Sequence, residues 1–140
     1  MESTAANNTV TLRGRVEEGS RIGRTIGFPT ANIAVEESPL PDGVYVAEAT
    51  IAGEEPPQRH PAVADLGVRP SVPGDSCRRL ETHLLDFSGD LYGRDIEVRL
   101  LHCLRPERRF GSVEELRRNI ALDMAAARRW FARRDARNEQ

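Results

Sequence analysis

The sequence predicts a mainly β protein, either a small barrel or a sandwich, with one helix at its C-terminal end. Six short segments are rich in β-forming residues or alternate apolar with polar residues, and turn residues separate them. Apolar residues at helical spacing occur only after residue 111. Because strands and helices do not alternate along the chain, the pattern argues against βαβ units and a parallel sheet.

The expected strands follow one another from Thr9 onward. In the first strand Val10, Leu12 and Val16 fall at even spacing, as in a strand with one buried face. Ser38–Gly43 reads SPLPDG and predicts a turn, because proline presets φ and Asp-Gly tolerates a tight backbone. The other strands are expected at residues 28–35, 44–52, 62–66, 80–87 and 96–104.

A helix is expected at about residues 112–135. Ser112 and Glu115 match a capping box, in which each side chain satisfies a backbone donor of the first turn. Seven arginines gather mainly late in this segment, where they suit the negative end of the helix dipole. We expect this helix to pack on the barrel. A nucleic-acid-binding arm and a membrane-surface helix are the alternatives. The apolar stripe consists of Val113, Leu116, Ile120, Met124, Ala127 and Phe131.

Length and composition indicate one folded domain. The chain has 140 residues, of which 20 are basic and 22 acidic, and 39% are apolar. This balance excludes wholesale disorder, and no apolar run approaches the ~20 residues that span a bilayer. We expect a flexible tail at residues 1–8 and one domain at 9–137, with the barrel at about 9–104. The N-terminus lacks a signal-peptide pattern, so a cytoplasmic location is expected. We also expect a monomer.

All 20 basic residues are arginines, which excludes mechanisms that need a side-chain amine. Arginine suits bidentate phosphate recognition, although codon bias on a solvated surface explains the same composition. Cys77 and Cys103 are expected to be reduced. His60, His83 and His102 are scattered along the chain, so we predict no zinc site.

A glycine-rich segment is the first candidate site. Gly19, Gly23 and Gly27 are spaced by four, which would let backbone amides approach an anion closely. Arg21 and Arg24 would add charge-assisted donors. A long flexible hairpin is the alternative, because the spacing is not the Walker pattern.

Thr30 and Asn32 follow this segment and carry oxygen ligands of the kind that Mg²⁺ accepts. In an extended segment alternate residues share a face, so both side chains are expected to point the same way. Spacing and chemistry together predict one site, in which the glycine loop cradles phosphates and a metal ion lies beside them.

Two further segments carry candidate residues. Glu81 is an acidic residue within a strand of otherwise buried type, where it faces solvent, pairs with an arginine or serves as a base in a cleft. Arg105 and Phe110 lie between the last strand and the helix. They either clamp a polar ligand and stack on its ring, or are a surface-loop arginine and a core phenylalanine.

Taken together, these segments resemble the riboflavin kinase (flavokinase) family, ATP-dependent enzymes that in many bacteria form the second half of a bifunctional FAD synthetase. The strings GFPTAN and E-x-HLLDF-x-x-DLYG are specific to that family. The matching segments keep the family's order over roughly residues 12–128: Gly14–Ile33, Leu40–Tyr45, Leu66–Ser71, Glu81–Gly93 and Leu104–Asp123.

The resemblance implies a six-stranded antiparallel Greek-key barrel with the C-terminal helix packed against it. It also implies transfer of the γ-phosphoryl group of ATP to the ribityl 5′-hydroxyl of riboflavin, giving FMN and ADP, with Mg²⁺ as cofactor. The roles that it implies are phosphate contacts from Gly19 to Gly27, metal and phosphate binding by Thr30 and Asn32, a base at Glu81, and flavin contacts at Arg105 and Phe110.

One departure from the family pattern opens an alternative. Asp65 stands where the family usually has asparagine, which places a carboxylate near the expected phosphate pocket. It favours a non-catalytic flavin- or nucleotide-binding module of the same fold, whereas Thr30, Asn32 and Glu81 favour the enzyme. We expect neither a nucleic-acid partner nor a membrane partner. The 13 residues before Gly14 are too few for an adenylyltransferase, so FMN rather than FAD is the expected product.

Overall fold

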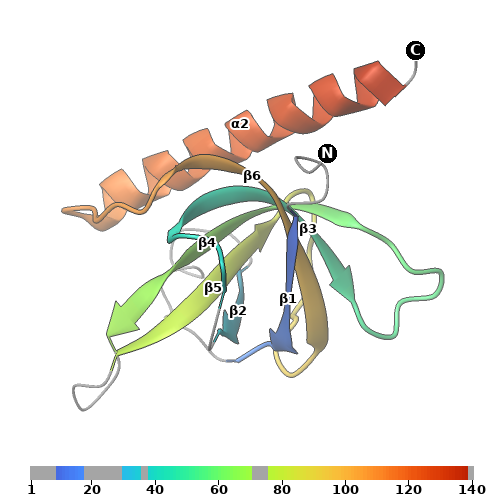
Figure 1. Cartoon of the computed structure of the whole chain (residues 1–140), viewed down its shortest axis with the longest axis horizontal. Helices are drawn as coiled ribbons and strands as arrows, with labels where there is room; N and C mark the ends of the chain where they lie inside the picture. The colour runs from blue at the N-terminus through green and yellow to red at the C-terminus, as the bar shows by residue number, and fades with distance from the viewer. Residues whose placement is uncertain (1–8, 18–29, 36–37, 71–75, 139–140) are drawn as a thin grey trace.

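The computed structural model describes residues 9–17, 30–35, 38–70 and 76–138 of the chain. It shows a strongly curved sheet of six antiparallel strands with one helix across its outer face (Figure 1). The predicted barrel with a C-terminal helix is therefore confirmed. The elements are β1 (Val10–Arg15), β2 (Thr30–Ala34), β3 (Gly43–Ile51), β4 (His60–Pro70), β5 (Ser76–Leu84), β6 (Asp95–Pro106) and α2 (Val113–Asn138).

The strand order is β1-β6-β3-β4-β5-β2, and every neighbouring pair is antiparallel. Strands β3, β4 and β5 follow one another as neighbours, and β6 returns to lie beside β3. This arrangement is a Greek key, which confirms the topology that the family resemblance implies.

The two edge strands of the sheet approach each other and bring the sheet towards closure. The backbone N–H of Glu17 donates to the carbonyl of Asn32 at 2.7 Å, which joins the end of β1 to β2. A Cβ at Gly14 would lie 3.2 Å from the Cβ of Ile33. The two strands can therefore cross this closely because residue 14 has no side chain.

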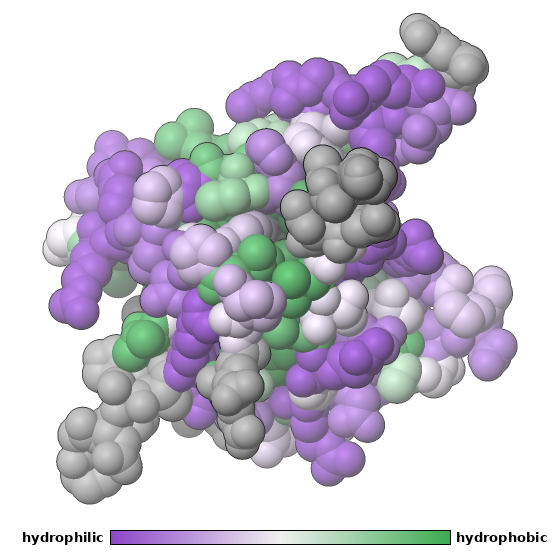
Figure 2. Space-filling model, in the orientation of Figure 1, coloured by the Kyte–Doolittle hydropathy of each residue, from purple (hydrophilic) through white to green (hydrophobic). Residues whose placement is uncertain are grey.

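Two apolar clusters hold the elements together. One fills the barrel interior and includes Tyr45, Ala47 and Ala49 from one face of β3. The other lies between the sheet and α2, where Val44 and Val46 from the opposite face of β3 meet Ala127 and Phe131 of the helix, together with Val63 and Leu85. Strand β3 is consequently buried on both faces. The side of α2 that faces solvent is largely hydrophilic (Figure 2).

Strand ends differ from the sequence prediction where pairing between strands decides them. Strand β4 covers 60–70 rather than 62–66, because it pairs with β5 as far as Pro70. Strand β5 ends at Leu84 rather than 87, because Asp86 adopts a left-handed conformation with φ of 53°. Helix α2 continues to Asn138, three residues beyond the expected end.

Strand β6 carries two irregularities opposite the first half of β3. Leu104, between the residues that face Val44 and Tyr45, and Leu101, between those that face Val46 and Ala47, have no facing residue on β3. An extra residue of this kind is a β-bulge, which reverses the side of the sheet to which the following residues point. Among the described residues, no helix is both long enough and apolar enough to cross a membrane.

We expect Gly14→Val to destabilise the protein. The added side chain would collide with the Cβ of Ile33, and overpacking of this kind typically costs about 1–3 kcal/mol. Denaturant unfolding would measure the difference. Gly111→Val is the control, because only the Glu115 Oε2 atom, 3.9 Å away, lies near its added Cβ. A Gly14→Val variant as stable as the original chain would contradict the close approach of β1 and β2.

We also expect the stability to decrease as the pH rises above about 10. Burial, followed by the neighbouring Cys103, raises the pKa of Tyr45, whose hydroxyl donates to the Pro41 carbonyl at 2.6 Å. The unfolded chain then loses the tyrosine proton first, so the stabilisation present below pH 10 is lost at higher pH. Urea unfolding between about pH 9 and 11 should show this loss, and Tyr45→Phe should flatten the profile. An identical profile for Tyr45→Phe would exclude Tyr45 as the cause.

Candidate active site

Polar residues from several strands form one row across the sheet. The register pairs Asn32 of β2 with Glu81 of β5, and Glu81 with Asp65 of β4. Directly opposed residues of antiparallel strands point to the same side, with Cβ atoms about 4.5–5.5 Å apart. The row continues through Val44 of β3 to Arg105 of β6. We call these five positions the cross-strand row.

The cross-strand row lies on the outer face of the barrel. Ala31, Ile33 and Leu80, which alternate with the row residues, are fully buried in the interior cluster. Val44, by contrast, packs beneath α2. The row therefore has an amide and two carboxylates at one end, the helix above its centre and a guanidinium at the other end.

Thr30 lies beside the row, two residues before Asn32 in β2. Its Oγ1 atom is 3.1 Å from Nδ1 of His83, which faces it across the strand pair and is 6% exposed. The expectation that Thr30 and Asn32 share one face is confirmed. Sequence analysis gave His83 no role, although its place in the HLLDF string, two residues after Glu81, was a signal of a position on the same face.

Asn32 has the chemistry that a bound cation requires. Its side chain is 6% exposed, and its Oδ1 atom is buried with no hydrogen-bond partner in the described part of the chain. An unsatisfied buried acceptor costs about 1–3 kcal/mol, which a ligand can offset. Hydroxyl and amide oxygens are ligands for Mg²⁺. Residues 9–17, 30–35, 38–70 and 76–138 hold no cluster of three or more His, Cys, Asp or Glu suited to a metal.

Arg105 and Phe110 come together at the other end of the row. The Cζ atom of Arg105 lies 5.5 Å from the Phe110 ring centroid. The guanidinium donates to both carboxylate oxygens of Asp123, with Nε–Oδ1 3.0 Å and Nη2–Oδ2 2.8 Å. These hydrogen bonds raise the pKa of Arg105, and the charge of Asp65 adds to the effect.

Asp123 was missed by sequence analysis, although a signal existed. It lies on α2 between Ile120 and Ala127, within the apolar stripe that faces the sheet, and is only 8% exposed. A carboxylate in a buried stripe requires a charged or hydrogen-bonding partner. The pattern could have predicted such a partner, but not that it is Arg105 of β6.

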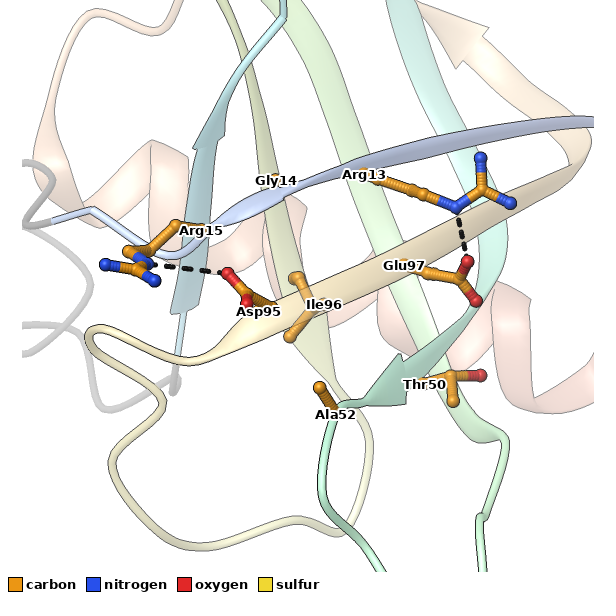
Figure 3. Close-up of a pocket in the computed structure, with 8 residues that line it drawn as sticks. All are labelled: Arg13, Gly14, Arg15, Thr50, Ala52, Asp95, Ile96 and Glu97. Carbon is orange, nitrogen blue, oxygen red and sulfur yellow. Dashed lines mark hydrogen bonds and ion pairs between the residues drawn. The ribbon is translucent and has the colours of Figure 1, made fainter.

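The predicted phosphate contacts at Gly19, Arg21, Gly23, Arg24 and Gly27 lie outside the described residues. A pocket of about 460 Å³ lies elsewhere, on β1, β3 and β6 (Figure 3). Its charged residues pair with one another across β1 and β6, Arg13 with Glu97 and Arg15 with Asp95. None of the predicted site residues lines this pocket, so we locate the candidate site on the cross-strand row.

Fold and site together define a Greek-key barrel protein with a row of polar residues on its outer face beside the C-terminal helix. The family model described as riboflavin kinase matches residues 6–131. The chain therefore belongs to the riboflavin kinase family.

Similar proteins agree with this assignment. A bifunctional riboflavin kinase/FMN adenylyltransferase of Escherichia coli K12 is 47% identical over 121 residues, which cover 86% of this chain and 37% of that protein. A Bacillus subtilis protein named RNA-binding riboflavin kinase RibR is 38% identical over 120 residues, covering 86% of this chain and 50% of its own length. The chain thus spans about 37% of the length of its bifunctional relatives.

Two solved structures share the fold. A Streptococcus pneumoniae structure described as a macrolide-efflux protein has a TM-score of 0.74 and 33% identity, covering 89% of this chain and 40% of its own. The riboflavin kinase of Trypanosoma brucei has a TM-score of 0.64 and 24% identity, covering 89% and 80%. At this identity the second likeness concerns the fold alone.

Proposed function

We propose that this chain transfers the γ-phosphoryl group of ATP to the ribityl 5′-hydroxyl of riboflavin, giving FMN and ADP. One observation carries the proposal. The cross-strand row places Glu81 between Asn32, at the proposed phosphate end, and Arg105, at the proposed flavin end. With strands about 4.8 Å apart, the row extends about 19 Å along the sheet. The acceptor hydroxyl must lie between the phosphates and the flavin ring, and Glu81 occupies that intermediate place.

Thr30 and Asn32 would hold Mg²⁺. The contact with His83 would orient the Thr30 hydroxyl, and Mg²⁺ would give the buried Oδ1 atom of Asn32 an interaction partner. When bound, the ion neutralises negative charge on the phosphates. Nucleotide contacts from Gly19, Gly23 and Gly27, with Arg21 and Arg24, remain part of the proposal.

Glu81 would orient the 5′-hydroxyl and accept its proton late in the transfer. A loose phosphoryl transition state needs in-line positioning and charge neutralisation more than it needs a strong base. At the other end of the row, Arg105 would contact the flavin and Phe110 would stack on its ring. The proposed partners are riboflavin and FMN with ATP and ADP, for a monomer that uses neither nucleic acid nor a membrane.

We expect Glu81→Gln to reduce turnover by two or more decades, because general base assistance typically contributes ~10²–10⁴-fold. Riboflavin affinity should stay within a few-fold, since the amide keeps the shape of the carboxylate. Chromatography for FMN and flavin fluorescence would measure the two quantities. Glu97→Gln, at an exposed ion pair on β6, is the matched control. A fully active Glu81→Gln enzyme would remove Glu81 from the mechanism.

We expect Asn32→Ala to raise the Mg²⁺ concentration that gives half-maximal rate by about tenfold or more, as is usual when a metal site loses a supporting group. The reason is the loss of the Asn32 oxygen, which has no hydrogen-bond partner among the described residues. Rates measured across a Mg²⁺ titration test this. Unchanged Mg²⁺ dependence in the variant would place the ion elsewhere.

The original chain decides between the enzyme and its alternative. Incubation with riboflavin, ATP and Mg²⁺ should produce FMN. Flavin binding without FMN would select the non-catalytic binding module. If the chain bound neither flavin nor nucleotide, both functions would be excluded.

A further inference from the structure

Asp123 is a buried charged residue for which the proposed reaction has no use. Its side chain is 11% exposed and lies on the face of α2 that meets the sheet, four residues before Ala127. Burial of a carboxylate is unfavourable unless it is paired and hydrogen-bonded. Both of its oxygens accept from Arg105, which is the paired, forked geometry that orients a guanidinium most strictly.

The contact between Asp123 and Arg105 connects helix α2 to the cross-strand row. Ala127 and Phe131 of α2 belong to the same apolar cluster as Val44, the row residue that directly faces Arg105. The helix therefore lies above the centre of the row, and Asp123 extends from it to the last row position. Arg105 is thus held by an element outside the sheet that carries it.

Two further carboxylates, Asp65 and Glu107, attract the same guanidinium. Asp65 lies in the row on the other side of Val44 and attracts Arg105 electrostatically. Beyond Asp65 lies Glu81, the proposed base. Without Asp123, the attraction of Asp65 would draw the arginine along the row and away from the Phe110 ring, whose centroid lies 5.5 Å from its Cζ atom.

We propose that Asp123 is a positioning residue for the flavin end of the site. It fixes the guanidinium of Arg105 beside Phe110 before substrate arrives, and it holds that charge away from Asp65. The inference rests on the proposed function, because it takes Arg105 and Phe110 as the flavin contacts. It adds that a helix outside the barrel sets their geometry.

We expect Asp123→Asn to raise the KM for riboflavin about tenfold or more, since small displacements of positioning groups have effects of this size. The KM for ATP and the kcat should change less than threefold, because Thr30, Asn32 and Glu81 are untouched. A merely structural role for Asp123 would instead lower the amount of active protein without separating the two KM values.

Asp86→Asn is the matched control. Asp86 also binds an arginine of α2 through both oxygens, at 2.7 and 2.9 Å from Arg128, but at an exposed turn. Asparagine tolerates the left-handed conformation of residue 86. This variant should leave the riboflavin KM unchanged. Equal riboflavin KM values in Asp123→Asn and Asp86→Asn would overturn the inference.

A double variant tests the route through Arg105. If Asp123 acts only through that residue, Arg105→Gln combined with Asp123→Asn should bind riboflavin no more weakly than Arg105→Gln alone. Additive losses would overturn the inference.

If Asp123→Asn fails to fold, Asp123→Glu is the alternative variant. It retains the charge, displaces it by one methylene, and should still raise the riboflavin KM. If the original chain neither binds riboflavin nor forms FMN, the proposed function itself is overturned. If the chain is active but its riboflavin KM does not change in Asp123→Asn, only the role of Asp123 is overturned.

Discussion

The antiparallel register of β2, β5 and β4 is the constraint on which the site depends. It is fixed by alternation: Leu80, Thr82 and Leu84 of β5 are buried, so Glu81 between them must face outward. A slip of one residue would turn the carboxylate into the apolar interior, at a large cost in free energy. The hydrophobic core therefore specifies the alignment of Asn32, Glu81 and Asp65, although none of these residues belongs to it.

Ion pairs as well as apolar contacts attach the helix to this sheet. Within the described residues, three arginine–carboxylate pairs link α2 to the barrel: Arg105–Asp123, Arg128–Asp86 and Arg134–Glu48. The apolar contact contains Ala127 and Phe131 as its buried helical members, and Met124 and Trp130 pack against it. The sequence alone did not decide whether codon bias or phosphate recognition explains the abundance of arginine. At these three positions arginine has a structural use.

The sequence predicted what local patterns determine. The alternation of Val10, Leu12 and Val16 identified β1, and the 30–32 spacing placed Thr30 and Asn32 on one face. The ends of β4 were wrong because they depend on its pairing with β5, and the end of β5 was wrong because Asp86 adopts a left-handed conformation. The proximity of Glu81 to Asn32 was implied only by the family resemblance, since a register across strands is not visible in one segment. The Asp123–Arg105 contact depends on helix docking and was missed for the same reason.

The two register shifts of β6 act together. Leu101 and Leu104 have no facing residue on β3, and both pack against the apolar cluster beneath α2. Each extra residue reverses the alternation of the residues that follow it, so the second shift restores the phase that the first one changed. Arg105 therefore faces outward opposite Val44, as it would in a strand without insertions. Two extra residues thus give β6 additional apolar contacts beneath the helix without turning the arginine at its end into the barrel.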